Sequence, residues 1–307
     1  MNNKYIIGID LGGTNLKIAL FDRQFRFKSR ELRATGNFSC QESLIAGIAE
    51  AILKIIKGNK LKKSNILGVG LGLPGPIDVE KGLVHFFPNI PGWMNVPLKK
   101  ILEKKVGLPV FIDNDANLMC LAEYKLGSAK HAKNAVCLTL GTGVGGGLII
   151  EGKLYRGSSF AAGEIGHMPI NEKGPACNCG GTACLESYIG NRKIAGIIKK
   201  TFKKDISLEE VSRMAGKNNK KAVKIWEDVA EKLGLALVGV VNLLNPDRIV
   251  IGGGVANAGR VLFAKVEETI ISRAMVVQAK KVKVLKAKLG NDAGMLGAAL
   301  LVKEQTE

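Results

Sequence analysis

The sequence is poor in aromatic residues, and it has no long apolar run. Aromatic residues make up 5% of the 307 residues, so the stacked aromatic platforms that bind single-stranded nucleic acid are not expected. No apolar segment approaches the roughly 18 residues that a membrane-spanning helix needs. The 6 cysteines follow no secretion signal, so a disulfide scaffold is not expected either. We therefore expect a cytoplasmic protein that does not enter a membrane.

Acidic residues are scarce as well, with 27 Asp and Glu against 45 Lys and Arg, and the formal net charge is +18. Such a charge is found in proteins that bind nucleic acid. The lysines are dispersed, however, at helical spacing among apolar residues, for example in 53–63 and 199–204. This pattern is typical of solvated helix faces. We predict no specific binding of nucleic acid.

Strands alternate with helices along the chain, which indicates an α/β fold. The length exceeds the roughly 100–200 residues of one common domain, so two domains are expected. The order strand, glycine turn, strand occurs near residue 10 and again near residue 140, which predicts two halves of related fold. Predicted strand segments are 4–9, 16–21, 25–33, 65–75, 109–117 and 134–140, and predicted helices are 41–57, 97–107 and 292–303.

Glycine is abundant, with 38 residues, and three predicted strands run directly into glycine turns. These turns are DLGGTN (10–15), GTGVGGG (141–147) and GGG (252–254). Glycines let backbone N–H groups approach an anion, so three such turns favour a di- or triphosphate ligand over simple tight turns. Neither a Walker loop nor the dinucleotide fingerprint is present. Thr14 and Thr142 could donate hydroxyl groups to phosphate, and Asp10 could hold a water of Mg²⁺.

The segment FIDNDAN places four polar side chains at the end of a predicted strand: Asp113, Asn114, Asp115 and Asn117. Capping of the following helix explains one of them. Carboxylates and amides together suit a polyhydroxyl ligand, because each sugar hydroxyl both donates and accepts a hydrogen bond. A carboxylate aimed at one hydroxyl can also remove its proton.

The segment GEIGHMPINEKGPACNCGGTACLE contains half of the cysteines and one of the 3 histidines. His167, Cys177, Cys179 and Cys184 have the spacing of a closed, tetrahedral zinc site of the structural type. A redox pair or unligated thiols are the alternatives, and the C-x-C spacing with a nearby histidine favours zinc. The other cysteines lie singly in apolar surroundings and are expected to be inert.

These segments together resemble the repressor–open reading frame–kinase (ROK) family of sugar kinases. The resemblance is carried, in order, by DLGGTN, LPGPID, PNIPGW, DNDAN, GTGVGGG, GEIGH, CNCGGTACLE and NPDRIVIGGGV. It implies an actin-like fold of two ribonuclease-H-like α/β domains with an active-site cleft between them. The implied bounds are 1–115, joined by the C-terminal helix at 295–307, and 116–294.

The resemblance also implies a set of binding residues. For ATP, they are Asp10, Gly12, Gly13 and Thr14 in a first phosphate loop, Thr142 and Gly143 in a second, and Gly253 and Gly254 near the nucleoside. For the sugar, they are Gly75, Asn89, Asn114, Asp115, Glu164, His167 and Glu186. Asp115 would be the catalytic base. Zinc would hold one nitrogen of His167, which leaves the other protonated and able to contact a sugar hydroxyl.

The activity implied is ATP-dependent phosphorylation of a hexose at its 6-hydroxyl, with Mg²⁺ bound to the ATP, by a homodimer or higher homo-oligomer. Glucose is the expected hexose; the alternatives are N-acetylmannosamine, N-acetylglucosamine, mannose and fructose. The family also contains sugar-responsive repressors, whose DNA-binding domain precedes the first phosphate loop. Asp10 lies so early here that we expect an enzyme rather than a sugar-sensing regulator.

One position departs from the pattern of the family. Ala183 stands before the last cysteine of the zinc segment, where the family usually has glycine. If this position requires a positive φ, alanine costs about 1 kcal/mol there. We expect a slightly weaker metal site rather than a lost one.

Overall fold

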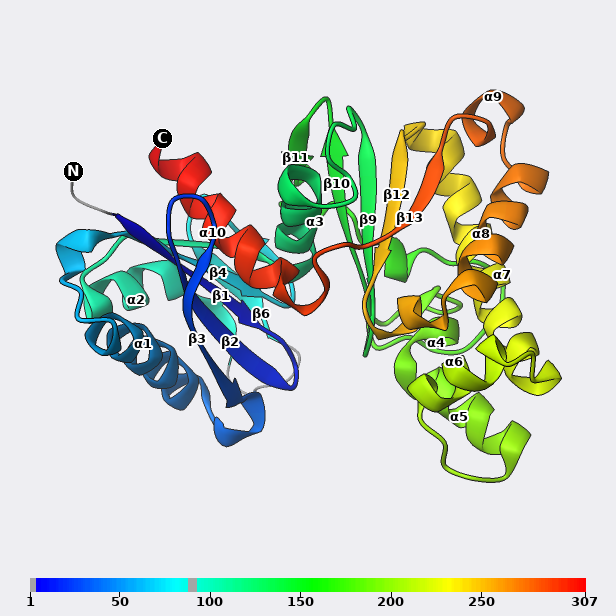
Figure 1. The fold of residues 1–307 in the computed structure, drawn as a ribbon, viewed down its shortest axis with the longest axis horizontal. Helices are drawn as coiled ribbons and strands as arrows, with labels where there is room; N and C mark the ends of the chain where they lie inside the picture. The colour runs from blue at the N-terminus through cyan, green and yellow to red at the C-terminus, as the bar shows by residue number, and fades with distance from the viewer. Residues whose placement is uncertain (1–3, 88–92) are drawn as a thin grey trace. The chain divides into compact units, whose positions relative to one another are not determined.

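The structure is a computed structural model that describes residues 4–87 and 93–307 (Figure 1). The chain forms two compact units. Unit 1 comprises Met1–Ala122, Arg156–Ala162 and Asn291–Glu307, and unit 2 comprises Glu123–Tyr155 and Gly163–Gly290. The domain bounds inferred from the sequence stay a prediction, since compact units need not coincide with independently folding domains. In the part of the chain that the structure describes, no helix is long and apolar enough to cross a membrane.

Unit 1 contains a five-stranded sheet made of β1 (Tyr5–Leu11), β2 (Asn15–Phe21), β3 (Phe27–Ala34), β4 (Ile66–Leu73) and β8 (Val110–Asn114). Its strand order is β3-β2-β1-β4-β8. β1 pairs antiparallel with β2 and parallel with β4, and β4 pairs parallel with β8. The parallel strands end at the same edge of the sheet, which is where the predicted sugar-binding residues of unit 1 follow in the sequence.

Helices cover both faces of this sheet (Figure 1). They are α1 (Gln41–Gly58), α2 (Leu98–Val106), the first part of α3 (Asp115–Leu126) and α10 (Ala293–Thr306). Ile7 and Ile9 of β1 belong to one buried cluster with Leu44 of α1 and Leu98 of α2. Because side chains alternate along a strand, Gly8 and Asp10 face the other side, where α10 lies.

Helix α10 approaches the sheet closely enough for its backbone atoms to contact two of the strands. A Cβ atom added to Gly8 would overlap with the carbonyl oxygen of Met295, and one added to Gly70 would overlap with that of Ala298. The helix itself has a glycine, Gly297, where it meets the backbone of α3. Glycine at these positions therefore sets how closely α10 lies on β1, β4 and α3.

Unit 2 repeats the arrangement of strands found in unit 1. Its sheet consists of β9 (Ala135–Leu140), β10 (Val144–Ile150), β11 (Lys153–Tyr155), β12 (Arg248–Gly252) and β13 (Lys283–Lys286). The order is β11-β10-β9-β12-β13, and the first two strands in sequence are again antiparallel, with parallel strands following. The predicted repetition of fold is confirmed.

The remaining elements of unit 2 are mostly helices, which follow the segment around Cys184. They are α4 (Glu186–Ile189), α5 (Asn191–Phe202), α6 (Leu208–Gly216), α7 (Lys220–Leu244), α8 (Arg260–Arg273) and α9 (Val276–Ala279). Trp226 of α7 is fully buried, and Gly234 of the same helix lies directly against Thr269 of α8. These two long helices form the helical core of the unit.

A small sheet in unit 1 was not predicted from the sequence. It consists of β5 (Ile77–Asp78), β6 (Leu83–Phe86) and β7 (Met94–Val96), in the order β5-β6-β7. Strands this short carry too few residues for an alternating pattern to be recognised. In contrast, the predicted helix ending at Gly107 is confirmed, because that glycine has a φ of 66° and terminates α2.

The close approach of α10 can be tested by adding a methyl group at Gly70. Gly70→Ala should lower the free energy of unfolding by at least about 1–3 kcal/mol, because the new methyl overlaps with backbone that cannot rotate away. Gly58→Ala, at the end of α1 with no atom within 4 Å of the added methyl, should leave it unchanged or raise it by up to about 1 kcal/mol, because alanine favours a helix more than glycine does. Urea denaturation of both variants measures the difference; equal stabilities would contradict the packing described.

Candidate functional site

The first glycine turn joins β1 to β2 in unit 1. The N–H of Gly12 donates to the carbonyl of Asn15 at 2.9 Å, and the hydroxyl of Thr35 donates to the carbonyl of Gly12 at 2.8 Å. Gly13 and Thr14, at the tip, are exposed. Hydrogen bonds thus hold the base of the turn, and its tip is exposed to solvent, as a phosphate-binding loop requires.

Asp10 lies beside this turn and is held by two features that the sequence analysis did not identify. Lys17, its cross-strand partner on β2, places Nζ 2.9 Å from a carboxylate oxygen of Asp10, and both side chains are partly buried. Gly294, in the first turn of α10, leaves space for the carboxylate: a Cβ atom there would lie 2.5 Å from its carbon. The positive end of the helix dipole also favours a negative charge at this place.

The polar turn between β8 and α3 has a defined hydrogen-bond pattern. Asn114 caps α3, because its side-chain oxygen accepts the N–H groups of Ala116 and Asn117 at 2.9 and 3.2 Å. Its side-chain nitrogen donates to the carbonyl of Gly75 at 3.2 Å, and Gly75 has a φ of 92°. Asp115 is the first residue of α3, and one of its oxygens accepts the N–H of Ala116 at 2.8 Å. Gly75, Asn114 and Asp115 are therefore brought together, as predicted.

Asp113 has a different role from its neighbours. Its side chain is 1% exposed, and one oxygen accepts Nε and Nη2 of Arg156 at 2.8 and 2.6 Å. The other oxygen accepts the N–H of Asn114 at 2.7 Å and the side-chain nitrogen of Asn117 at 3.1 Å. Both oxygens are thus engaged inside the protein. Arg156 was missed by sequence reasoning, because 43 residues separate it from its partner.

The second glycine turn joins β9 to β10 in unit 2. The N–H of Gly141 donates to the carbonyl of Gly143 at 2.9 Å, and Thr142 at the tip is exposed. One carboxylate oxygen of Glu186 accepts the N–H of Val144 at 2.8 Å, and a Cβ atom on Gly143 would lie 2.4 Å from this oxygen. Glu186, expected to bind sugar, is therefore also bonded to the second glycine turn.

The third glycine turn lies next to the second one. Gly253 has a φ of 83°, and a Cβ atom on it would overlap with the carbonyl oxygen of Leu140, where β9 ends. Gly254 begins a short 3₁₀ helix, Gly254–Ala258, with no atom within 4 Å of where a Cβ would be. The two turns predicted to bind the nucleotide are therefore neighbours within unit 2.

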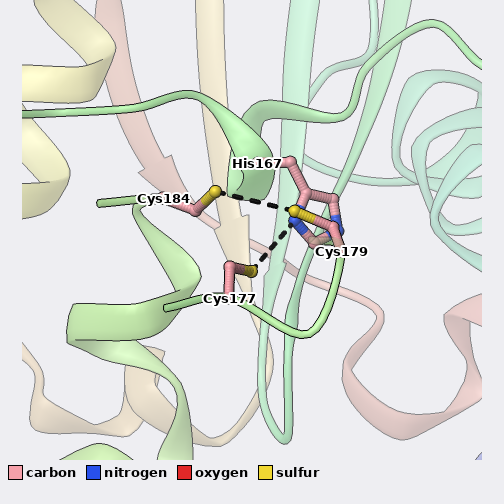
Figure 2. A group of neighbouring side chains, drawn as sticks. All are labelled: His167, Cys177, Cys179 and Cys184. Carbon is pink, nitrogen blue, oxygen red and sulfur yellow. Dashed lines mark hydrogen bonds between the residues drawn. The ribbon is translucent and has the colours of Figure 1, made fainter. Parts of the chain in front are cut away.

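The four predicted metal ligands converge in unit 2 (Figure 2). The ligand atoms of His167, Cys177, Cys179 and Cys184 all lie within 4.8 Å of one another. The sulfurs of Cys179 and Cys184 are 3.7 Å apart, and the sulfur of Cys177 is 3.6 Å from Nδ1 of His167. Tetrahedral zinc with bonds of about 2.3 Å to sulfur and 2.0–2.1 Å to nitrogen needs separations of about 3.8 and 3.5 Å. The two shorter pairs have these separations, and the remaining ligand atoms, within 4.8 Å, would need to move closer by up to about 1 Å to bind one zinc ion.

The thiols of this cluster have unlike affinities for protons. Burial raises the pKa of Cys184 to about 12, and the neighbouring sulfurs of Cys179 and Cys177 add to this effect. Burial also acts to raise the pKa of Cys177, but the backbone N–H of Cys179 and hydrogen bonds with Ser187, Cys179 and His167 outweigh it and lower the pKa to about 7. An ionised thiol therefore raises the pKa of its neighbours. A divalent cation bound between the sulfurs would instead stabilise the thiolates together.

The imidazole of His167 presents its two nitrogens to different partners. Nδ1 faces the sulfurs, whereas Nε2 is 3.9 Å from a carboxylate oxygen of Glu164, beyond hydrogen-bond distance. Glu164 precedes the short 3₁₀ helix Ile165–His167, and its side chain is about half exposed. A ligand hydroxyl between these two groups would find both a donor and an acceptor.

The predicted residues therefore fall into two sets. Unit 1 holds the first glycine turn, Asp10 and the turn around Asp115, and unit 2 holds the other glycine turns and the loop of Glu164, His167 and Glu186. Asn89, expected to bind sugar, lies outside the described residues.

Comparison with known families matches residues 6–305 to the model of the ROK family. The chain belongs to the ROK family. A glucokinase from Halalkalibacterium halodurans is 36% identical and aligns over 99% of this chain and 97% of its own length. A xylose repressor from Caldicellulosiruptor bescii is 34% identical over 97% of this chain, but over 77% of its own length.

Solved structures of the ROK family share the fold. The ROK family glucokinase from Streptomyces griseus, determined in complex with glucose and AMPPNP, has a TM-score of 0.85 and 30% identity. The match covers 98% of this chain and 99% of that one. The chain thus has the actin-like ATPase fold that the sequence resemblance implied.

Ala183 occupies the position where the ROK pattern usually has glycine, and its φ is 57°. This left-handed conformation costs a residue with a Cβ atom roughly 1–2 kcal/mol. The methyl group is fully buried, however, and burial of one such group returns about 0.8 kcal/mol. The strain that the sequence suggested is present, and packing offsets part of it.

Relative to a glycine substitution elsewhere in the segment, Ala183→Gly should therefore favour the folded state by up to about 1 kcal/mol, because relief of strain exceeds the lost burial. Ala176 is a matched control in the same segment, since it is exposed and is not among the positive-φ residues. Ala176→Gly should lower stability slightly, because glycine gains more freedom in the unfolded chain. Thermal unfolding of both variants with metal present measures the difference; a loss of stability in Ala183→Gly that exceeds the loss in Ala176→Gly by the full value of the lost burial, about 0.8 kcal/mol, would show that φ at 183 carries no strain.

Proposed function

We propose that the protein is an ATP-dependent sugar kinase that phosphorylates glucose at its 6-hydroxyl. The observation that carries this proposal is the turn between β8 and α3, where Asn114 and Gly75 hold the backbone next to the carboxylate of Asp115. The family membership supports it, because a glucokinase of nearly the same length is 36% identical to this chain.

In this proposal, Asp115 accepts the proton of the 6-hydroxyl as that oxygen attacks the γ-phosphate of ATP. Its place at the first residue of α3 fixes its backbone, so little reorganisation is needed when the sugar binds. Asn114 and the loop at Gly75 orient the sugar, because the Asn114 side chain is already fixed at both ends by internal hydrogen bonds. Asn89 retains its predicted role in binding the sugar.

The residues of unit 2 take two tasks. Thr142, Gly143, Gly253 and Gly254 would bind ATP through open backbone, together with Gly12, Gly13 and Thr14 of unit 1. Glu164, Glu186 and Nε2 of His167 would bind sugar hydroxyls. One oxygen of Glu186 already holds the N–H of Val144, so we assign its other oxygen to the sugar.

Two metal ions belong to the proposal. Asp10 is an oxygen donor at the first phosphate turn and would hold Mg²⁺, which neutralises charge on the ATP phosphates when bound. Lys17 keeps the carboxylate of Asp10 in place through their ion pair. His167, Cys177, Cys179 and Cys184 would hold a structural zinc ion, which fixes the tautomer of His167 so that Nε2 carries the proton.

A sugar-responsive regulator is the second candidate, because a xylose repressor is 34% identical to this chain. Within the kinases, N-acetylmannosamine, N-acetylglucosamine, mannose and fructose remain the alternative substrates. A spectrophotometric assay of ADP release with these hexoses and glucose separates the possibilities.

We expect glucose to give the highest kcat/KM in this assay and Asp115→Asn to lower kcat by roughly 10²–10⁴-fold. The amide keeps the oxygen that accepts the N–H of Ala116, so the variant should fold and bind glucose nearly as well. Asp228→Asn, an exposed residue of α7, is the matched control and should keep full turnover.

Preference for another hexose would contradict glucose as the substrate but would still support a sugar kinase. Turnover that survives in Asp115→Asn would mean that Asp115 is not the base. No turnover with any hexose would favour the regulator.

Zinc should be present at about one ion per chain, as measured by mass spectrometry of the purified protein. Cys179→Ser should lose the ion and become less stable, because three ligands hold zinc less tightly than four. Cys40→Ser is the control: Cys40 lies at the start of α1, where serine is a good cap, so metal and stability should be kept. A metal-free preparation with full stability and activity would refute the zinc site.

A further inference from the structure

One short segment belongs to a different unit from the residues on either side of it. The chain leaves unit 2 after Tyr155, runs through unit 1 as Arg156–Ala162, and continues in unit 2 from Gly163. The segment is closed at its base, because the N–H of Ala162 donates to the carbonyl of Arg156 at 2.9 Å. Gly157 and Phe160 both have a positive φ, at 73° and 61°. Arg156 thus stands at the base of a tightly turned loop.

The side chain of Arg156 reaches from this loop to the end of β8. Two of its nitrogens, Nε and Nη2, bind the same oxygen of Asp113, and the two side chains are 23% and 1% exposed. A carboxylate that is removed from water to this extent is costly unless a cation and hydrogen bonds compensate it. Arg156 provides both, and its planar guanidinium fixes the direction of the carboxylate as well.

The second oxygen of Asp113 binds two residues of the turn at the start of α3, so that fixing the carboxylate also restrains this turn. It accepts the N–H of Asn114 and the side-chain nitrogen of Asn117, and Asn117 is itself buried. Asn114 in turn caps α3 and binds the carbonyl of Gly75. A continuous chain of hydrogen bonds therefore runs from Arg156, through Asp113, to Asn114 and Asn117, which lie on either side of Asp115 in the sequence.

We propose that Arg156 is a positioning residue for phosphoryl transfer, and that it acts through Asp113 on the backbone that carries Asp115. This inference rests on the proposed function, because it takes Asp115 to be the base. Arg156 is assigned no contact with substrate. Without it, the buried carboxylate of Asp113 turns toward water or another donor, and the turn loses the two bonds that fix Asn114 and Asn117. A shift of about 1 Å in a reacting group can cost about 10²-fold in rate.

The test compares Arg156→Met with Arg213→Met, an exposed arginine of α6 whose ion pair with Glu210 lies on the surface. We expect Arg156→Met to lower kcat by about 10–100-fold, with the KM for ATP changed less than about threefold. Arg156→Lys should recover part of this loss, since it restores the charge but not the two-nitrogen contact. Arg213→Met should have no effect. A kcat within about threefold of the parent enzyme in Arg156→Met would overturn the proposal and leave Arg156 a purely structural role.

Hydrogen exchange gives a readout that does not depend on activity. In Arg156→Met, the amides of Asn114, Ala116 and Asn117 should exchange faster, whereas those of β9, in unit 2, should not. Unchanged exchange at these three amides would overturn the positioning role even if the kinase assay succeeds. Faster exchange together with no kinase activity in the parent protein would instead refute the proposed function and support the link from Arg156 to the turn.

Discussion

The contact between helix α10 and the sheet of unit 1 is made by backbone atoms, and much of the candidate site depends on it. Gly8 and Gly70 have no side chains to hold the helix away, so the carbonyl groups of Met295 and Ala298 lie directly on β1 and β4. This approach brings the first turn of α10, with Gly294, against the carboxylate of Asp10. A residue with a side chain at Gly8 or Gly70 would displace the helix from the place where Asp10 and Lys17 pair.

In unit 2, a similar dependence runs from the cysteine cluster to the second glycine turn. Cys184 and Glu186 are two residues apart, and the N–H of Ser187, in α4, donates to the carbonyl of Cys184 at 2.9 Å. Whatever fixes the sulfur of Cys184 therefore also limits where the carboxylate of Glu186 can lie, and that carboxylate holds the N–H of Val144. The metal ligands, a proposed sugar ligand and a proposed phosphate turn thus form one connected structure.

The sequence allowed prediction of those features that are local or that follow from residue type. The glycine turns, the polar turn at Asp115 and the cluster of one histidine and three cysteines could be identified because each lies within a short segment of unusual composition. Lys17 and Arg156 were missed for different reasons. Lys17 pairs with Asp10 only through the register of the β1–β2 hairpin, and Arg156 reaches Asp113 across a large separation in sequence. The sequence indicated that Ala183 would be strained if its φ were positive. Only the structure shows that its φ is positive and that its methyl group is buried, which offsets part of the strain.

Helix α10 also bears on the order in which the protein folds during translation. The strands of unit 1 are made first, but α10 follows all of unit 2 in the sequence. As the chain leaves the ribosome, the glycine-bearing face of β1 and β4 stays uncovered until the second unit has been synthesised. The last strand of the unit 2 sheet, β13, by contrast, is synthesised before α10. Domains usually fold from the N-terminus onward during synthesis. In this protein the unit that begins first is completed last, and the face of β1 and β4 that α10 covers stays without that helix in the interval.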